Sequence, residues 1–539
     1  MKTFYLFYLI FFLALTSFAQ EINWTFELKD SSFGQTAAGD IDGDGKLELV
    51  FGCYRNDGNI YALNAEDGSL LWKYNTSLNG KDACNDAAPI IYDIDEDGIP
   101  EVIVASSCTA RTYCLNGTDG TVKWAAQSRG SDSPPSIADI DNDGKDEILH
   151  GEFGGYVICF DALTGAQEWE IAVDTHSWIQ TAPSIADFDL DGNLDFVVAT
   201  WNAVEGDTNR VYAYRGYDQK LLWSFDLAKY AYHGTAIANL DEDFYPELVI
   251  GDYSGLLIVL NAEDGSLVWD AVDSPSYYIG GPVAIGNIDT ELEEELVIPT
   301  GSQIVCRNKN GDLKWKIVQN DAGQSFRGVA LSDITGDNIP DILLATSTGK
   351  VAAYSGIGTP SQIFEYNIND YYGKSLDFNN APIVADFDED GTLDMFVIGG
   401  YTTYPDYESN YGLAISFKAG KGAGPDWLMF QKNIRRTSSD YLDPVSVKDV
   451  PMLGKVIISP NPSSEYIIID YPFNKNEQVD MYETIRIFDV LGNEMQTTCI
   501  HKQSTSQERN RIQINVSALP TGTYFLRTGS VVQKFMIVR

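Results

Sequence analysis

The most constraining feature of this sequence is an acidic nine-residue pattern, Asp-x-Asp-x-Asp-Gly-x-x-Asp/Glu, which recurs along the chain ahead of apolar, strand-like runs. Complete copies start at Asp40, Asp93, Asp139, Asp187 and Asp386, and weaker copies start at Asn239, Asn287 and Asp333. The starts lie 53, 46, 48, 52, 48, 46 and 53 residues apart. A period of this length indicates a repeat architecture, in which each repeat is one supersecondary unit.

A second pattern shares this period and reads Tyr-Ala-Leu-Asn, then Asp-Gly, then Leu-Trp. Its copies end at Trp72, Trp124, Trp169, Trp223, Trp269, Trp315, Phe364 and Trp427. Each unit therefore holds four strand-like runs, which in the first unit cover 35–39, 47–52, 59–64 and 70–74. Asp-Gly between the third and fourth runs is a strong hairpin signal. Four antiparallel strands repeated about every 40 to 50 residues are typical of β-propeller blades. We predict an all-β propeller with eight blades; seven would fit if one terminal unit only caps the array.

The two ends of the repeat region suggest how the propeller closes. Residues 23–26 read as an isolated fourth strand, and residues 427–430 occupy the equivalent slot at the far end. A strand from one terminus that completes a blade at the other would leave fewer exposed edges. The sequence leaves open which of the two pairs outermost.

The N-terminus has the features of a secretory signal peptide. Lys2 precedes an almost wholly apolar run from Phe4 to Leu15, and Ser17 and Ala19 supply small residues for cleavage. A membrane anchor is the alternative, but the run is short and lacks a stop-transfer flank. We therefore expect a signal peptide over 1–19, a propeller over 20–437, a linker over 438–453 and a further domain over 454–539, with no transmembrane anchor.

The net charge of −42 is concentrated in the propeller. Residues 451–539 hold nine Lys/Arg and eight Asp/Glu, so the rest of the chain carries −43. Nucleic acid and anionic membranes are poor partners for such a surface.

Seven cysteines are an odd set for a secreted chain. Cys114, Cys159 and Cys306 share one slot in the third strand, where small buried hydrophobes are expected. Cys53, Cys84 and Cys108 fall in loops of the first two units, so one disulfide among them is plausible. Cys499 stands apart.

The acidic loops match the chemistry of calcium, which takes six to eight oxygen ligands. Carboxylates at positions 1, 3, 5 and 9 can converge, and Gly at position 6 allows the sharp turn. The expected ligands are Asp40, Asp42, Asp44, Glu48, Asp93, Asp95, Asp97, Glu101, Asp139, Asp141, Asp143, Glu147, Asp187, Asp189, Asp191, Asp195, Asp386, Asp388, Asp390 and Asp394. An EF-hand is excluded because Pro and β-branched residues, not a helix, follow the loops. Solvated Asp-Gly turns are the alternative, which five copies in register argue against.

The three weaker copies differ from one another. The copies at Asn239 and Asn287 lack both the first Asp and the Gly, so we expect weak or no metal there. The last keeps the carboxylates of Asp333, Asp337 and Asp341, and Asn338 tolerates the left-handed conformation almost as Gly does. Metal binding at this copy is left open.

At this point the residues resemble known families. The acidic loops followed by Phe51-Gly52 resemble FG-GAP and VCBS repeats, the calcium-loop propellers also found in integrin heads. The Tyr-Ala-Leu-Asn-x-x-Asp-Gly-x-x-x-Trp units resemble the tryptophan-docking repeats of quinoprotein-like propellers. Residues 454–539 resemble the C-terminal sorting domain of type IX secretion in Bacteroidota, through Pro460-Asn461-Pro462, Leu519-Pro520-Thr521-Gly522 and the terminal Lys534–Arg539 segment. This resemblance implies a small β-sandwich and export to the cell surface or medium by the type IX machinery.

Propeller geometry separates two faces. The acidic loops and the Asp-Gly hairpins should lie at one end of each blade, and the interblade and second-to-third-strand loops at the other. The second face holds aromatic and polar residues suited to sugar stacking or protein contact. The candidate ligand face comprises His176, Trp178, Tyr230, Tyr232, His233, Tyr277, Tyr278, Arg327, Tyr371 and Tyr372. For any single aromatic, packing between blades is the competing interpretation.

We expect a secreted or surface-displayed, calcium-stabilised propeller that binds or adheres to carbohydrate or an extracellular protein. The alternative is a calcium-dependent polysaccharide-degrading enzyme. The resemblance to other eight-bladed propellers implies it, because some of those propellers are calcium-dependent polysaccharide lyases. His176 and His233 lie on neighbouring interblade loops and could serve, with Arg327 or a carboxylate, as acid and base. Four histidines and no catalytic signature favour the binding module. A quinone-dependent dehydrogenase is disfavoured because the adjacent cysteine pair of that family is missing.

Overall fold

The computed structural model describes residues 21–427 except 203, 205–207, 242–244, 273–277, 292 and 423. In the C-terminal region it describes 457–459, 466–472, 486–489, 498–505, 509–517, 519–520, 522–528 and 531–537. The predicted signal peptide and linker lie outside these residues. Of the described residues, 21–132, 284–306 and 313–427 form one compact unit, and 133–283, 307–312 and the C-terminal strands form a second.

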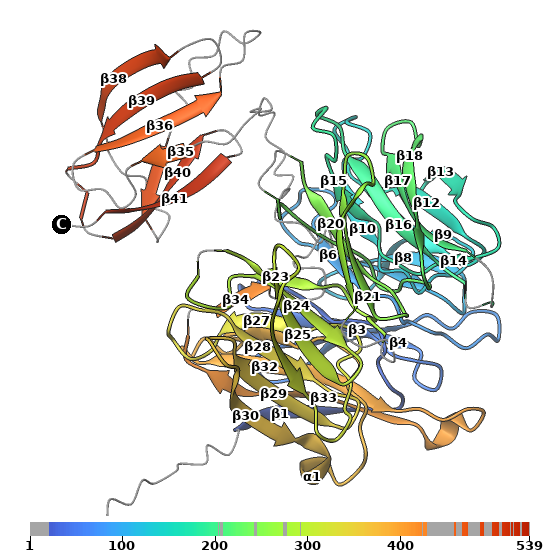
Figure 1. Ribbon diagram of the computed structural model, residues 1–539. Coiled ribbons are helices and arrows are strands. Elements are labelled where there is room, and N and C mark those ends of the chain that lie inside the picture. Colours follow the sequence, from blue (N-terminus) through green and yellow to red (C-terminus); the bar gives the residue numbers. More distant parts are fainter. Residues whose placement is uncertain are drawn as a thin grey trace, which may run out of the picture. The chain divides into compact units, whose positions relative to one another are not determined.

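The first unit contains five antiparallel blades, some of whose strands are labelled in Figure 1. Blade 1 consists of β2 (Ala37–Gly39), β3 (Glu48–Gly52), β4 (Asn59–Asn64) and β5 (Leu70–Asn75), and blade 2 of β6 (Ile90–Tyr92), β7 (Glu101–Ser106), β8 (Arg111–Asn116) and β9 (Val122–Gln127). Blade 6 consists of β23 (Ala284–Gly286), β24 (Glu295–Thr300), β25 (Gln303–Asn308) and β26 (Leu313–Val318), with its hairpin 307–312 in the second unit. Blade 7 consists of β27 (Ala330–Asp333), β28 (Asp341–Ala345), β29 (Lys350–Ser355) and β30 (Ser361–Asn367), and blade 8 of β31 (Ile383–Ala385), β32 (Leu393–Tyr401), β33 (Tyr411–Gly420) and β1 (Ile22–Leu28).

The second unit contains three further blades. Blade 3 consists of β10 (Ser136–Ala138), β11 (Glu147–Glu152), β12 (Tyr156–Asp161) and β13 (Gln167–Ala172). Blade 4 consists of β15 (Ser184–Ala186), β16 (Asp195–Trp201), β17 (Asn209–Arg215) and β18 (Leu221–Leu227), with the extra strand β14 (Trp178–Ile179) paired to β16. Blade 5 consists of β19 (Ala236–Ala238), β20 (Glu247–Gly251), β21 (Leu256–Asn261) and β22 (Leu267–Val272). The prediction of an eight-bladed all-β propeller is confirmed.

The C-terminal strands form two antiparallel sheets. One has the order β35 (Ile457–Ser459), β36 (Tyr466–Pro472), β39 (Arg509–Asn515) and β38 (Thr498–Thr505). The other has the order β37 (Arg486–Asp489), β40 (Gly522–Thr528) and β41 (Val531–Ile537).

Burial along each blade follows strand position. In β7 every residue is buried, whereas the outer strand β9 has one buried residue among exposed and partly buried ones. A strand flanked by neighbouring blades on both faces needs a continuous apolar run, and an outer strand needs only an alternating one. Helix is nearly absent from the described residues, which contain only α1 (Ile368–Tyr372) and the 3-10 turn η1 (Tyr407–Ser409). None of the helices described is long and apolar enough to cross a membrane.

The N-terminal strand, not the segment at Trp427, completes blade 8. β1 pairs antiparallel with β33, and the blue and orange strands lie side by side in Figure 1. The prediction that a terminal strand completes a distant blade is confirmed. The prediction that the segment at Trp427 takes the place of a fourth strand is wrong, because β34 (Gly424–Trp427) pairs with β27, the first strand of blade 7. The chain turns into blade 7 directly after β33, where the Lys421 N–H donates to the Ile334 carbonyl at 2.9 Å.

Tryptophans of the repeat join blade 8 to blade 1, blade 1 to blade 2 and blade 4 to blade 5. The Trp24 indole N–H donates to the Ala65 carbonyl at 2.8 Å, and Trp223 donates to Ala262 at 2.7 Å. The indole lies directly over a hairpin glycine: a Cβ on Gly68 would lie 2.4 Å from the Trp24 ring. Gly68 also has φ 71°, in the left-handed region that favours glycine. The Asp-Gly pair therefore makes the hairpin and leaves room for the tryptophan of the preceding blade.

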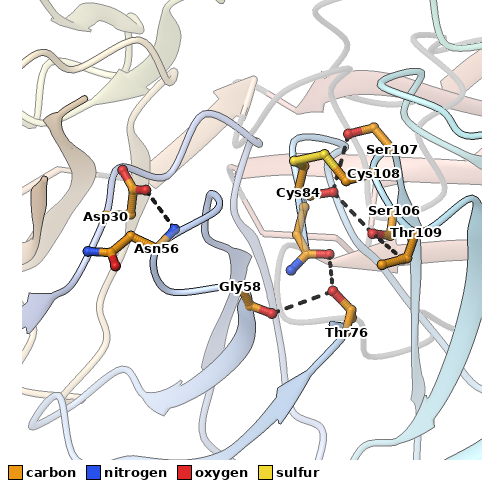
Figure 2. The surroundings of a disulfide bond; sticks show 10 residues. Asp30, Asn56, Gly58, Thr76, Cys84, Ser106, Ser107, Cys108 and Thr109 are labelled. Carbon is orange, nitrogen blue, oxygen red and sulfur yellow. Dashed lines mark hydrogen bonds between the residues drawn. A yellow bond between two sulfur atoms is a disulfide. The ribbon is translucent and has the colours of Figure 1, made fainter. Parts of the chain in front are cut away.

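One disulfide joins loops around blade 2. Cys84 and Cys108 are bonded, with 5.1 Å between their Cα atoms, which confirms that one pair forms among the three loop cysteines. Figure 2 shows that the Cys84 carbonyl also accepts hydrogen bonds from the Ser106 and Ser107 side chains. Cys53 and the three third-strand cysteines are buried and unbonded, as expected for small hydrophobes.

Candidate functional site

The acidic patterns form the loops between the first and second strands of the blades. The hairpins between the third and fourth strands lie at the same end, since Lys46 in the first loop pairs with Glu66 in the first hairpin at 3.0 Å. The predicted division of the blade ends is thus supported in blade 1. This end is built from repeated, closely similar turns.

Backbone N–H groups shape each acidic loop around its carboxylates. In blade 1 the Gly45 N–H donates to Asp40 Oδ2 at 3.0 Å, and the Ile41 N–H donates to Glu48 Oε2 at 2.9 Å. The bond from position 2 to position 9 recurs in all eight blades. The ninth carboxylate therefore closes every loop, including those with incomplete motifs.

The sharp turn needs left-handed backbone at two positions. Gly at position 6 has φ between 80° and 91° in the complete copies, and Asn338 takes the same place in blade 7 with φ 65°. Position 4 is also left-handed, although it holds Glu96, Asn142, Leu190 or Glu389 in four copies. The sequence pattern did not reveal this second position, because no single residue type marks it.

Carboxylates from three positions converge in the loops. Asp40, Asp42 and Glu48 present oxygens within 4.8 Å of one another. The same holds for the sets Asp93, Asp95, Glu101; Asp139, Asp141, Glu147; Asp187, Asp189, Asp195; and Asp289, Glu291, Glu295. Position 5 is absent from the first four sets, where its carboxylate accepts the N–H of position 7, as Asp44 does from Lys46 at 2.8 Å; in the last set Glu291 is the residue at position 5. In blades 1, 3 and 4 this donor set fits a hard divalent cation.

Burial and crowding oppose ionisation of the ninth carboxylate. Burial, aided by the loop aspartates, raises the pKa of Glu48 to about 7, that of Asp195 to about 7 and that of Glu147 to about 9. A bound cation would reverse this effect by favouring the charged forms.

This crowding predicts opposite pH responses with and without metal. Without metal, the raised pKa means that the folded chain holds protons that the unfolded chain releases between about pH 4.5 and 7. Lowering the pH from 7.5 to 5.5 should therefore raise the melting temperature of chelated protein. With saturating calcium the same change should lower it, since protons compete for the ligands. Differential scanning calorimetry at both pH values, with and without chelator, measures the two slopes, and slopes of the same sign would contradict the prediction.

A strip of aromatic side chains lies at the opposite end of the blades in the second unit. Successive ring centroids are 4.7 Å apart for Phe153 and Trp178, 5.2 Å for Trp178 and Trp201, and 5.0 Å for Trp201 and Tyr230. The strip continues to Tyr253 at 4.4 Å from Tyr230 and then to Tyr278 at 5.0 Å. We call Phe153, Trp178, Trp201, Tyr230, Tyr253 and Tyr278 the aromatic strip.

The extra strand β14 creates the centre of the aromatic strip. It places Trp178 directly opposite Trp201 in the register, and the two indoles stack with only 13° between their planes. The Trp178 side chain remains 41% exposed, and the other five are partly buried. Because large apolar rings are normally covered, exposed indole beside five partly exposed rings forms a surface suited to a ligand.

The predicted ligand-face residues separate into several environments. Trp178, Tyr230 and Tyr278 lie in the aromatic strip, and Tyr232 is 6.5 Å from Tyr253. Tyr371 and Tyr372 lie on α1 in the first unit, where Tyr372 is 6.3 Å from Tyr411. Tyr277 lies outside the described residues.

The other candidates do not form a shared acid-base pair. His176 is exposed and lies 3.6 Å from Asp174, whereas His233 is fully buried beneath Tyr232. Arg327 is also buried, and its backbone carbonyl accepts from Gln35 while its guanidinium donates to the Asp86 carbonyl. His233 is 0% and Arg327 5% exposed, so neither side chain is open to a ligand in this structure.

Sequence reasoning missed Phe153, Trp201 and Tyr253. All three lie at or just after the end of a second strand, in Gly151-Glu152-Phe153, Thr200-Trp201 and Gly251-Asp252-Tyr253. The recurrence of an aromatic after the second strand in three successive units was the available signal.

Three family models match the chain. The FG-GAP-like repeat matches residues 40–104 and 93–150, and the model described as outer membrane protein assembly factor BamB matches 154–392. The secretion system C-terminal sorting domain matches 457–538. The chain therefore combines FG-GAP-like and quinoprotein-type repeats with a sorting domain that implies contact with a secretion machinery, which fits a secreted or cell-surface protein. No curated protein matches the chain.

Solved structures with the same fold have diverse roles. The V. cholerae biofilm matrix protein Bap1 is 16% identical, with 74% of this chain and 91% of that chain covered and a TM-score of 0.54. A quinohemoprotein alcohol dehydrogenase from Pseudomonas putida is 14% identical, with 75% and 76% covered and a TM-score of 0.52. A europium-containing methanol dehydrogenase is 13% identical, with 74% and 93% covered and a TM-score of 0.52. At these identities the likeness shows the fold alone.

Proposed function

We propose that this protein is a calcium-stabilised propeller, exported through its C-terminal sorting domain, that binds an extended neutral polysaccharide along the aromatic strip. The single observation that carries the binding proposal is the unbroken contact of six aromatic rings from Phe153 to Tyr278. Sugar rings present apolar faces, and aromatic side chains provide matching area at low conformational cost.

The negative charge of the protein favours a neutral ligand over an acidic one. A net charge of −42 repels polyanions, so a polysaccharide rich in uronate or sulfate is disfavoured. Protein is the other ligand class that an aromatic surface fits. The strip runs along three successive blades, which suits a linear polymer that contacts many rings in succession. Multiple weak contacts along one chain give useful retention without one deep pocket.

The identity of the metal rests on the loops. Asp40, Asp42 and Glu48 offer only oxygen ligands in a loop that tolerates a flexible shell, which favours calcium over zinc or copper. The metal loops and the aromatic strip lie at opposite ends of the blades. Calcium therefore stabilises the scaffold and does not contact the ligand.

Two separate variants, Trp201→Ala and Trp178→Ala, should each abolish retention on neutral polysaccharides. Each truncation should cost about 1 to 4 kcal/mol of binding free energy, because central aromatics dominate such surfaces. Affinity gel electrophoresis with neutral and acidic polysaccharides measures the loss.

Tyr217→Ala is the matched control for these variants. Tyr217 is 42% exposed, close to the 41% of Trp178, but lies in the third-to-fourth-strand hairpin of blade 4, at the other end. Its removal should leave retention unchanged. Equal loss in all three variants, or binding only to acidic polymers, would contradict the proposal. Release of unsaturated products would instead support a lyase.

A further inference from the structure

Three of the acidic loops already contain a cation from the chain itself. In blade 6 the Lys314 amino group lies 2.5 Å from Asp289, 3.0 Å from Glu291 and 2.8 Å from Glu295. These are the carboxylates that would otherwise converge on a metal ion. The amino group therefore occupies the position that a metal would take.

Blade 8 has the same arrangement despite its complete motif. The Lys418 amino group lies 2.8 Å from Asp388, 3.0 Å from Asp390 and 3.1 Å from Asp394. Asn23 of β1 adds a donor to the same site, since its amide donates to Asp394 Oδ1 at 2.8 Å. The carboxylates of this loop therefore have hydrogen-bonding partners from two strands, Lys418 from β33 and Asn23 from β1.

Blade 2 shows a partial version. The Lys123 amino group lies 2.5 Å from Asp95 and 2.8 Å from Glu101. Although burial opposes the charge of these lysines, hydrogen bonds to the carboxylates raise the pKa of Lys123, Lys314 and Lys418 well above the ordinary value. All three amino groups therefore stay charged at neutral pH.

One strand position controls the charge near the loop in most blades. Lys123 and Lys314 each precede the docking tryptophan of the fourth strand. The same position holds Leu71 in blade 1, Glu168 in blade 3 and Leu222 in blade 4. Leucine supplies no cation, and Glu168 adds a negative charge close to Asp141. Among the described ion pairs, none places a cation on the converging carboxylates of blades 1, 3 and 4; Lys145 in blade 3 pairs with Asp143, which is not one of them.

We propose that Lys123, Lys314 and Lys418 replace the metal ion in blades 2, 6 and 8, so that only the remaining loops bind calcium. A bound divalent ion and a lysine ammonium cannot occupy the same few ångströms, because like charges at that distance repel strongly. The complete motifs at Asp93 and Asp386 consequently do not act as metal sites. Part of the propeller keeps its loops folded when calcium is scarce.

Counting bound ions by native mass spectrometry tests this directly. Eight loops less the three that hold a lysine leave at most five calcium ions in the purified protein at saturation. Lys314→Met should add one ion to that count, because it removes the internal cation and leaves Asp289, Glu291 and Glu295 in place. The same variant should melt below the wild type in chelator and recover when calcium is added.

Lys145→Met is the matched control. Lys145 belongs to the acidic loop of blade 3 but is 61% exposed, and its ion pair among the described residues is with Asp143, at 3.1 Å and outside the converging set, so its loss should change neither the ion count nor the response to calcium. Lys418→Met provides an independent second test should Lys314→Met fail to fold. A wild-type count above five, or folded lysine variants that gain no ion, would overturn the proposal.

Discussion

Exhaustive removal of calcium is expected to lower the melting temperature of the propeller by on the order of 10 °C. A ligand that binds only the folded state at one hundred times its Kd stabilises that state by about 2.7 kcal/mol per site. The loops of blades 1, 3 and 4 hold converging carboxylates that are crowded without a cation. Their contributions add, since each loop lies in a separate blade.

Calorimetry in chelator and in excess calcium measures this shift. Asp187→Asn should reproduce about one third of it, because it removes a ligand from one loop only. Magnesium should restore less stability than calcium, since it demands a tighter octahedral shell. An unchanged melting curve in chelator would show that the acidic loops are solvated turns without metal.

The acidic loops and the aromatic strip lie at different ends of the blades, and this bears on how the protein can diverge. The acidic end repeats one turn, in which the backbone N–H of position 2 donates to the carboxylate of position 9 in every blade. The other end varies from blade to blade, and only there does an extra strand bring Trp178 onto Trp201. Loops on a rigid scaffold can change without loss of the fold, so binding surfaces collect there.

The blades were predictable because local chemistry determines them. Asp-Gly at 67–68 makes a hairpin whatever lies elsewhere, and the acidic loop forms from hydrogen bonds within nine residues. The period of these local signals was enough to count eight units. The disulfide could be narrowed to three loop cysteines for the same reason, since Cys84 and Cys108 are only 24 residues apart.

Contacts between distant strands were not predictable in this way. Lys418 lies 30 residues from Asp388 along the chain, and only the pairing of β32 with β33 brings them together. The motif at Asp386 therefore read as a complete metal site. Likewise the segments at Trp24 and Trp427 carry the same local pattern, and only their pairing with β33 and β27 distinguishes them. The aromatic strip was not predicted as a whole, because its rings come from the ends of second strands and from segments between blades, and only the structure shows that they touch.

Replacing Trp24 by Ala should destabilise the propeller by about 3 to 5 kcal/mol, the range for removal of a buried large aromatic side chain. Trp24 is 8% exposed, donates to Ala65, covers Gly68 and lies 5.8 Å from Phe396 of β32. It joins blade 8 to blade 1. Unlike the fourth strands of the other blades, β1 is not continuous with the third strand beside it.

Trp72→Ala is the matched comparison, because Trp72 makes the same docking contact, with Gly117 and Gly120, from a strand held covalently in its own blade. Both variants should lose similar free energy in chemical denaturation. Only Trp24→Ala should release β1, which limited proteolysis would report as early cleavage next to Leu28 at a protease level that leaves Trp72→Ala intact. Equal resistance of the two variants would mean that pairing with β33 alone holds the N-terminal strand and that the tryptophan does not control closure.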